Sequence, residues 1–234
     1  MLVGTRTSRL RVRILVIAVV AALLVAAGVL LGWVRPAWPG MAGPATEAVE
    51  LAQSLALIDE RAPIPDYRRE AFGEAWTDID GNGCAQRQDV LARDLIEITR
   101  DGCTVLTGVL EDPYTGRTVR FRHDRVAAPG EPGSTAVQID HVVSLAAAWR
   151  GGAFAWSDAE RLRFANTLGN LLAVDGAANQ GKGSKGPSAW LPPDPDAHCD
   201  YADRYARIAA AWDLAVTAAD RDALVGVLTR CGAP

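Results

Sequence analysis

The amino-acid sequence predicts an α+β fold, in which a few short strands are embedded in a mostly helical domain. Apolar residues recur at helical spacing near both ends of the chain. Between them lie short runs typical of strands, at residues 103–110, 117–121, 137–139 and 171–174. The chain has 234 residues, of which 49% are hydrophobic, and seven tryptophans, so it can bury the core of one ordinary domain.

Residues 1–35 are predicted to direct the protein out of the cytoplasm. Four arginines, at positions 6, 9, 11 and 13, precede an uncharged apolar run of 21 residues from Ile14 to Val34. That length matches a membrane-spanning helix of about 20 residues, and the flanking arginines would keep the N-terminus inside. The small-residue, proline-containing stretch 37–45 leaves a cleaved signal peptide open as the alternative. Either way, we expect the working domain at the cell envelope or outside the cell.

Four cysteines form an even set, which in an exported protein predicts two disulfide bonds. Three connectivities are open. We favour Cys84–Cys103 with Cys199–Cys231, because each of these pairs closes a short local loop. The sequence has no CxxC pair, which argues against a zinc ribbon or a thioredoxin-type site.

The segment 36–64 is expected to be a linker and an N-terminal helix, and 65–234 to be one domain. Pro36 to Pro44 is rich in proline and glycine. Residues 46–61 then carry apolar side chains near helical spacing until Pro63 ends the pattern.

The sequence Asp78-Ile79-Asp80-Gly81-Asn82-Gly83 is similar to the opening of a calcium-binding loop. Oxygen-bearing side chains stand at its first, third and fifth positions, and Asp89 stands at the twelfth, which favours Glu. A tight Asp/Gly turn that caps the next helix is therefore the better interpretation.

Further elements follow from periodicity and turn residues. Residues 85–100 are predicted to form a helix, and the runs around Glu-Asp-Pro-Tyr-Thr-Gly to form a β-hairpin. Ser157 and Glu160 have the spacing of a capping box. The remaining predicted elements are a strand at 137–139, helices at 142–150 and 157–165, a strand at 171–174, a helix capped by Asp175 and running through Asn179, and helices at 201–217 and 218–229.

Asp140, His141, Asn170 and Asn179 lie beside the two short central strands. Each alone has an ordinary structural explanation, since a lone histidine is more often structural than catalytic and asparagine commonly ties a turn to its own backbone. Their order over strand, helical insert, strand and helix makes the set informative. Successive side chains of a strand point to opposite faces, so a bend is needed to bring Asp140 and His141 to one phosphate.

This arrangement resembles the His-Asn-Asn variant of the HNH (ββα-metal, or His-Me finger) endonucleases. Its surroundings resemble the C-terminal domain of GmrSD-type modification-dependent restriction enzymes, at Gly169-Asn170-Leu171, Asn179, Lys182, Lys185 and Trp190. The whole exported part is more closely similar to secreted actinobacterial HNH-family proteins, whose N-terminal half is matched at Phe72-Gly73, Trp76, Asp80, Cys84, Arg87, Val90-Leu91 and Arg93-Asp94-Leu95. The resemblance covers about residues 65–231 and implies an HNH core within the α+β domain.

The resemblance also implies an endonuclease acting on DNA. His141 would be the general base, because the pKa of an imidazole lies near neutral pH. Asp140 and Asn179 would hold one divalent cation, Mg²⁺ or else Mn²⁺, since these ions prefer oxygen ligands. Asn170 would brace the loop that positions His141. The basic residues expected to contact the substrate are Arg87, Lys182 and Lys185.

Other functional classes are weighed against this one. Gly176 to Lys182 begins like a phosphate-binding loop, but Gly183 stands where Ser or Thr must bind Mg²⁺. GxSxG and HExxH motifs are absent from the sequence. The part after residue 35 has nine more acidic than basic residues, which argues against a broad basic surface for nucleic acid. This acidic balance favours the rival interpretation, a non-catalytic extracellular binding domain on a decayed nuclease scaffold.

The substrate and partners are predicted only in outline. No recognition module is evident, so we expect low sequence specificity, while modified DNA stays open as a substrate. The expected partners are DNA and, through residues 1–35, the membrane. No obligate protein partner is evident from the sequence.

Overall fold

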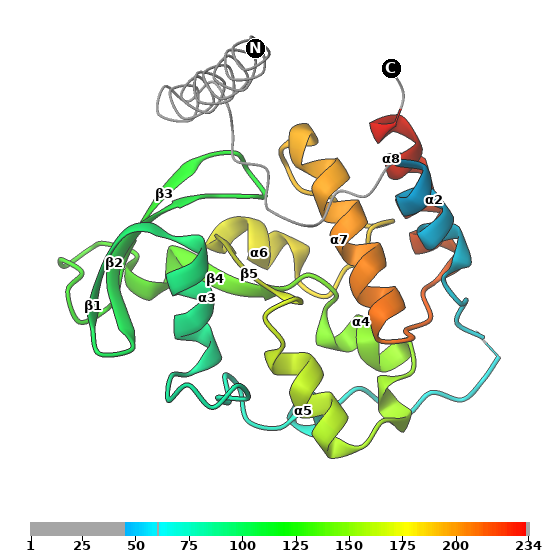
Figure 1. Cartoon of the computed structure of the whole chain (residues 1–234), viewed down its shortest axis with the longest axis horizontal. Coiled ribbons are helices and arrows are strands. Elements are labelled where there is room, and N and C mark those ends of the chain that lie inside the picture. Colours follow the sequence, from blue (N-terminus) through cyan, green and yellow to red (C-terminus); the bar gives the residue numbers. More distant parts are fainter. Residues whose placement is uncertain (1–44, 60, 233–234) are drawn as a thin grey trace, which may run out of the picture. The chain divides into compact units, whose positions relative to one another are not determined.

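The computed structural model describes residues 45–59 and 61–232. Strands β4 and β5 form a two-stranded antiparallel sheet (Figure 1), here called the β4–β5 hairpin although the helical segment 142–170 connects them. This hairpin lies between two hydrophobic cores. Strand β4 (Val137–His141) pairs antiparallel with β5 (Leu171–Asp175), in register along its whole length. Side chains alternate between the two faces of such a hairpin. One core therefore receives Val137, Ile139, Leu171 and Ala173, and the other receives Leu172 and Val174.

The first core lies between the hairpin, helix α3 (Gln86–Asp94) and a three-stranded antiparallel sheet of order β1–β2–β3. The strands are β1 (Ile96–Asp101), β2 (Thr104–Glu111) and β3 (Thr118–Arg122). Strands β2 and β3 confirm the hairpin predicted from the sequence. Together with the helices, these small antiparallel sheets confirm the predicted α+β class.

The helix predicted over 85–100 is wrong beyond Asp94. Leu95 has extended backbone angles and ends α3, and residues 96–101 form β1 instead. This strand contains β-branched residues (Ile96, Ile98 and Thr99), which fit a pleated sheet better than a helix. Pairing with β2 therefore overrides the helical periodicity of the segment.

The second core is mainly helical. Helix α2 (Ala45–Ser54) packs against α8 (Ala218–Cys231) and α7 (His198–Ala211), and Figure 1 shows α2 and α8 side by side. Helices α4 (Leu145–Arg150) and α5 (Asp158–Asn166) complete this core against the hairpin.

The helix predicted over 46–61 ends early, at Ser54. Beyond it the chain is extended and bonds to the segment before α8. The N–H of Val216 donates to the carbonyl of Ala56 at 2.9 Å, and the N–H of Ile58 donates to the carbonyl of Val216 at 3.0 Å. These tertiary hydrogen bonds replace the helical ones that the sequence pattern predicted.

Short helical elements connect the larger ones. Helix α6 (Gly176–Lys182) follows β5 directly, and the carboxylate of Asp175 accepts from the N–H of Ala178 at 2.8 Å, as the sequence predicted. The capping box of Ser157 and Glu160 at the start of α5 is also confirmed. Four 3₁₀ turns are found among the described residues: η1 (Arg69–Phe72), η2 (Gly133–Thr135), η3 (Ala153–Ala155) and η4 (Pro195–Ala197).

Both expected disulfide bonds are formed. Cys84–Cys103 ties the segment before α3 to the turn between β1 and β2, and Cys199–Cys231 ties the first turn of α7 to the end of α8. The apolar run 14–34 and the linker 36–44 lie outside the residues that the structure describes. Within 45–59 and 61–232, none of the helices has the length and apolar character needed to span a bilayer.

Candidate active site

Side chains from other elements cover the outer edge of β5, so the two-stranded hairpin is held without a third strand. The N–H groups of Ala173 and Asp175 donate to the carboxylates of Asp94 and Asp112, at 2.9 and 2.8 Å. Arg93 donates to the carbonyl of the first residue of β5 at 2.8 Å. An isolated two-stranded hairpin is marginally stable, and these charge-assisted contacts fix the frame on which the site is built.

Asn170 lies at the turn into β5 and is fully buried. Its Oδ1 accepts from the N–H of Val143 at 2.9 Å, and its Nδ2 donates to the carbonyl of Val143 at 3.1 Å. Its own carbonyl accepts from the N–H of Val142 at 2.9 Å. These three contacts hold the segment that directly follows His141.

His141 ends β4 on the face that belongs to the first core. Its Nε2 lies 2.7 Å from the carbonyl oxygen of Ala165 in the last turn of α5. A carbonyl only accepts, so the contact places the proton of the neutral ring on Nε2 and leaves Nδ1 as the basic atom. Burial lowers the pKa of His141 from 6.5 to about 4. The ring is therefore neutral at neutral pH, the form that can take up a proton.

A small cavity adjoins the His141 ring. Its volume is about 30 Å³, and its other lining residues include Arg69, Glu74 and Trp76. A cavity of this size holds at least one water molecule when polar groups line it. The site thus combines a neutral imidazole with room for a water molecule.

Asp140 lies on the other face of the hairpin and is only 5% exposed. Its Oδ2 accepts from the hydroxyl of Tyr114 at 2.6 Å, and its Oδ1 accepts from Nζ of Lys182 at 2.9 Å. Burial raises the pKa of Asp140, and the contacts with Lys182 and Tyr114 act in the opposite direction. Burial also raises the pKa of Tyr114 well above its ordinary value of 10.0, so its hydroxyl stays protonated and donates.

Asn179 lies on α6, which packs on the same face of the hairpin as Asp140. Its Nδ2 donates to Oε1 of Gln138 at 2.8 Å. Gln138 and Asp140 are two residues apart on β4, so their side chains lie on the same face of the strand. Asn179 and Lys182 are three residues apart on α6, so their side chains lie on the same face of the helix. The two side-chain contacts therefore run in parallel across the β4–α6 interface. The structure pairs Asp140 with Lys182 directly, and Asn179 lies on the same interface next to Gln138.

His141 is not part of that cluster. The β4–β5 register continues without a break through the pair His141↔Leu171, so the expected bend does not occur at His141. The imidazole and the Asp140 carboxylate consequently open on opposite faces of the hairpin. Because the two residues are consecutive, both side chains still lie at the same end of β4.

The donor groups at the β4–α6 interface suit a hard cation. Mg²⁺ is commonly held by one or two carboxylates, with water or phosphate completing its shell, and Asp140 with the amide oxygen of Asn179 offers this kind of chemistry. Both oxygens of Asp140 already accept a hydrogen bond, however. In the described part of the chain, no three His, Cys, Asp or Glu side chains are grouped to hold a metal ion. Each oxygen keeps a second lone pair, so a cation that uses Asp140 would bind beside its present partners or replace one of them.

The structure corrects the substrate-contacting role expected for Lys182. This side chain is fully buried, and its ammonium donates to Asp140 and, at 2.8 Å, to the carbonyl of His141. Arg87 donates at 3.3 Å to the carbonyls of Ser134 and Val137 and so ties α3 to the start of β4, while its contact with substrate stays a prediction. Of the three basic residues, Lys185 is the exposed one.

The segment Asp78–Gly83 forms a self-contained turn. The two carboxylate oxygens of Asp78 accept from the N–H groups of Gly81 and Gly83, at 2.7 and 2.8 Å. Both glycines have positive φ, 74° and 86°, which the tight turn requires. The turn is therefore confirmed, but the expected capping is not, because Ala85 precedes α3 without a side-chain cap.

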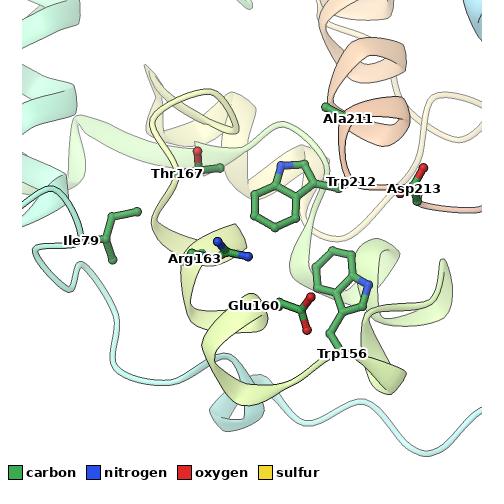
Figure 2. Close-up of a pocket in the computed structure, with 8 residues that line it drawn as sticks. All are labelled: Ile79, Trp156, Glu160, Arg163, Thr167, Ala211, Trp212 and Asp213. Carbon is green, nitrogen blue, oxygen red and sulfur yellow. The ribbon is translucent and has the colours of Figure 1, made fainter.

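A groove of about 500 Å³ lies beside α5 and is separate from the cavity at His141. Figure 2 shows the indole rings of Trp156 and Trp212 together, with Ile79 on the far side of Arg163. The ring centroids are 5.4 Å apart, and both rings also pack on Phe164 of the second core. None of the predicted site residues lines this groove, so its size alone does not locate the chemistry.

Sequence reasoning missed three contributors to the site. Tyr114 lies in the turn between β2 and β3, where an aromatic residue in a polar turn was its only signal. Trp76 belongs to the stretch similar to secreted HNH proteins, but nothing in its local sequence places it over His141. Ala165 contributes through its backbone carbonyl, which no side-chain pattern encodes.

Comparison with known proteins gives two matches. Residues 86–227 match the sequence model of the family described as "GmrSD restriction endonucleases, C-terminal domain". An uncharacterized secreted protein of Arthroderma benhamiae is 35% identical over 194 residues, which are 80% of this chain and 88% of that protein. No solved structure is significantly similar to the chain. The family match includes the hairpin, α6 and all four predicted catalytic and metal-binding residues, but it begins after Trp76.

Proposed function

The chain belongs to the family of GmrSD restriction endonuclease C-terminal domains, and from this premise we propose that it is an exported HNH-type endonuclease. Its substrate is DNA, whose phosphodiester bonds it hydrolyses with low sequence specificity. The family match supports the chemistry. The arginine-rich apolar N-terminal pattern, the two disulfide bonds and the name of the secreted relative support export.

The contact between His141 and Ala165 carries this proposal. With Nε2 bound to the carbonyl, Nδ1 accepts a proton from a water molecule as the water oxygen attacks phosphorus. The same carbonyl stabilises the imidazolium that forms, because hydrogen bonding to it favours the protonated ring. Asn170 assists indirectly by fixing the backbone that follows His141.

Asp140 and Asn179 would hold the divalent cation, Mg²⁺ or Mn²⁺. When bound, this cation would neutralise charge on the phosphate and on the leaving 3′-oxygen. Attacking and leaving oxygens lie on opposite sides of phosphorus in an in-line displacement. His141 and Asp140 leave the same end of β4 on opposite faces, and this arrangement suits that geometry.

Plasmid cleavage by the purified full chain tests the proposal, in Mg²⁺, Mn²⁺, Ca²⁺ or EDTA. We expect metal-dependent nicking that falls by about 100-fold or more in His141→Ala, in a protein that stays folded although its thermal midpoint falls because the Ala165 carbonyl loses its partner. His198→Ala is the matched control, because Nε2 of His198 makes the same kind of contact, 2.9 Å from the carbonyl of Pro192. A His141→Ala protein that remains active removes His141 as the base.

A non-catalytic extracellular binding domain is the second candidate. The acidic balance after residue 35 and the engagement of Asp140 by Lys182 favour it. The same assay separates the two candidates. Absence of cleavage of plasmid, single-stranded DNA and RNA in every metal would establish the binding domain as the better account.

A further inference from the structure

Lys182 places a positive charge inside the protein, directly at Asp140. Its side chain has no exposed surface, and its ammonium lies 2.9 Å from Oδ1 of Asp140, which is itself 5% exposed. The sequence contains only two lysines, Lys182 and Lys185, beside 22 arginines. A lysine suits this position because its ammonium is a compact charge that can serve one carboxylate oxygen and one carbonyl together.

The two partners of Asp140 are not equally replaceable. Tyr114 is fully buried, and its ring packs edge-on against Trp190 and Tyr201, with centroids 5.1 and 5.8 Å away. Lys182 is the last residue of α6 and lies between two exposed glycines, Gly181 and Gly183. The backbone around Lys182 is therefore the part of the cluster that can rearrange without opening a core.

Charge makes Lys182 and a divalent cation alternatives at this place. The single carboxylate of Asp140 balances one ammonium in the interior. Adding a divalent cation next to that ammonium would leave a large uncompensated positive charge in a region of low dielectric constant, which is strongly unfavourable. The two cations therefore compete for the single negative charge of Asp140.

We propose that Lys182 is a built-in competitor of the divalent cation, and that a cation binds Asp140 only when the Lys182 ammonium leaves it. This inference rests on the proposed function, in which Asp140 is a cation ligand. It assigns Lys182 the task of keeping Asp140 paired in the interior and of weakening cation affinity.

Mn²⁺ binding to the full chain, followed by electron paramagnetic resonance, tests the competition without reference to cleavage. We expect Lys182→Met to bind Mn²⁺ at least tenfold more tightly than the wild-type chain, and Lys185→Met to bind within twofold of it. The gain must vanish when Asp140→Asn is added to Lys182→Met. Unchanged or weaker binding by Lys182→Met would overturn the proposal, as would a gain that survives Asp140→Asn.

A second measurement needs no substitution, in case Lys182→Met does not fold. The wild-type chain is treated with an amine-reactive acetylating reagent, and the two lysines are followed by mass spectrometry. Lys182 should be protected without Mn²⁺ and become reactive at saturating Mn²⁺, while Lys185 reacts equally in both. Continued protection of Lys182 from acetylation at saturating Mn²⁺ would overturn the proposal. So would the absence of any Mn²⁺ binding by both the wild-type chain and Lys182→Met. Neither result depends on whether the protein cleaves DNA.

Discussion

The indole ring of Trp76 lies nearly parallel to the imidazole of His141, with ring centroids 6.1 Å apart and an interplanar angle of 16°. Trp76 has a φ of 63°, a left-handed backbone conformation that is strained for a bulky residue. Such strain persists only where surrounding contacts maintain it. Trp76 therefore covers the candidate base, from a segment that precedes the family match.

Replacing Trp76 by alanine should expose His141 to solvent. Burial is the main cause of the lowered pKa of His141, so we expect this pKa to rise in Trp76→Ala from about 4 toward its ordinary value of 6.5. The imidazole resonances in an NMR pH titration measure the shift, since the chain has only three histidines. Trp76→Phe should retain most of the depression. An unchanged titration in Trp76→Ala would mean that Trp76 does not shield the ring.

The lowered pKa of His141 also predicts how stability depends on pH. Between about pH 6.5 and 4 the unfolded chain binds a proton at this histidine while the folded chain does not, so stability falls as pH falls through that window. Protonation of His141 lowers the free energy of unfolding by about 3 kcal/mol once the pH is below 4, and has no effect above pH 6.5. Urea unfolding of wild-type and His141→Gln proteins at several pH values measures it. Equal pH dependence of the two proteins would contradict the prediction.

Asn170→Ala should destabilise the protein and misplace His141. It leaves the N–H and carbonyl of buried Val143 without their partners, which costs about 2–4 kcal/mol in free energy of unfolding. Asn179→Ala is the control, since it removes one partly buried contact and should cost about 1 kcal/mol. Chemical unfolding gives both values. A loss for Asn170→Ala no larger than that of the control would argue against the brace.

Several local features of the fold could be predicted because the residues that produce them are neighbours in the sequence. The capping box needs only Ser157 and Glu160, and the β2–β3 hairpin only its turn and two flanking runs. The strand β1 could not be predicted in this way. Its helical periodicity continues that of α3, and the partner that makes it a strand, β2, is a separate element.

The candidate site was predictable in its residues but not in its contacts. Asp140, His141 and Asn179 could be selected because their types and order are informative. The direction of Lys182 depends on which face of the hairpin α6 covers. Its partner Asp140 is also held by Tyr114, which comes from the distant β2–β3 turn. Likewise, the orientation of His141 depends on a backbone carbonyl of α5. These are tertiary relationships, which spacing along one chain does not determine.

The two disulfide bonds give the last prediction. Cys199–Cys231 closes a loop of 32 residues and Cys84–Cys103 one of 19. In the chain-entropy model they stabilise the fold by about 3.7 and about 3.2 kcal/mol, a difference of about 0.5 kcal/mol. Removing the Cys199–Cys231 bond should destabilise the fold further, because it frees the end of α8, the helix against which α2 packs.

We therefore expect Cys199→Ser with Cys231→Ser to lower the thermal midpoint more than Cys84→Ser with Cys103→Ser, and the single change Cys199→Ser to be destabilising as well. Thermal unfolding followed by circular dichroism measures this order. Reductant should lower the midpoint of the wild-type protein and leave a variant that lacks all four cysteines unchanged. A wild-type melting curve that is the same with and without reductant would count against both bonds as stabilising elements, because opening them must enlarge the conformational freedom of the unfolded chain.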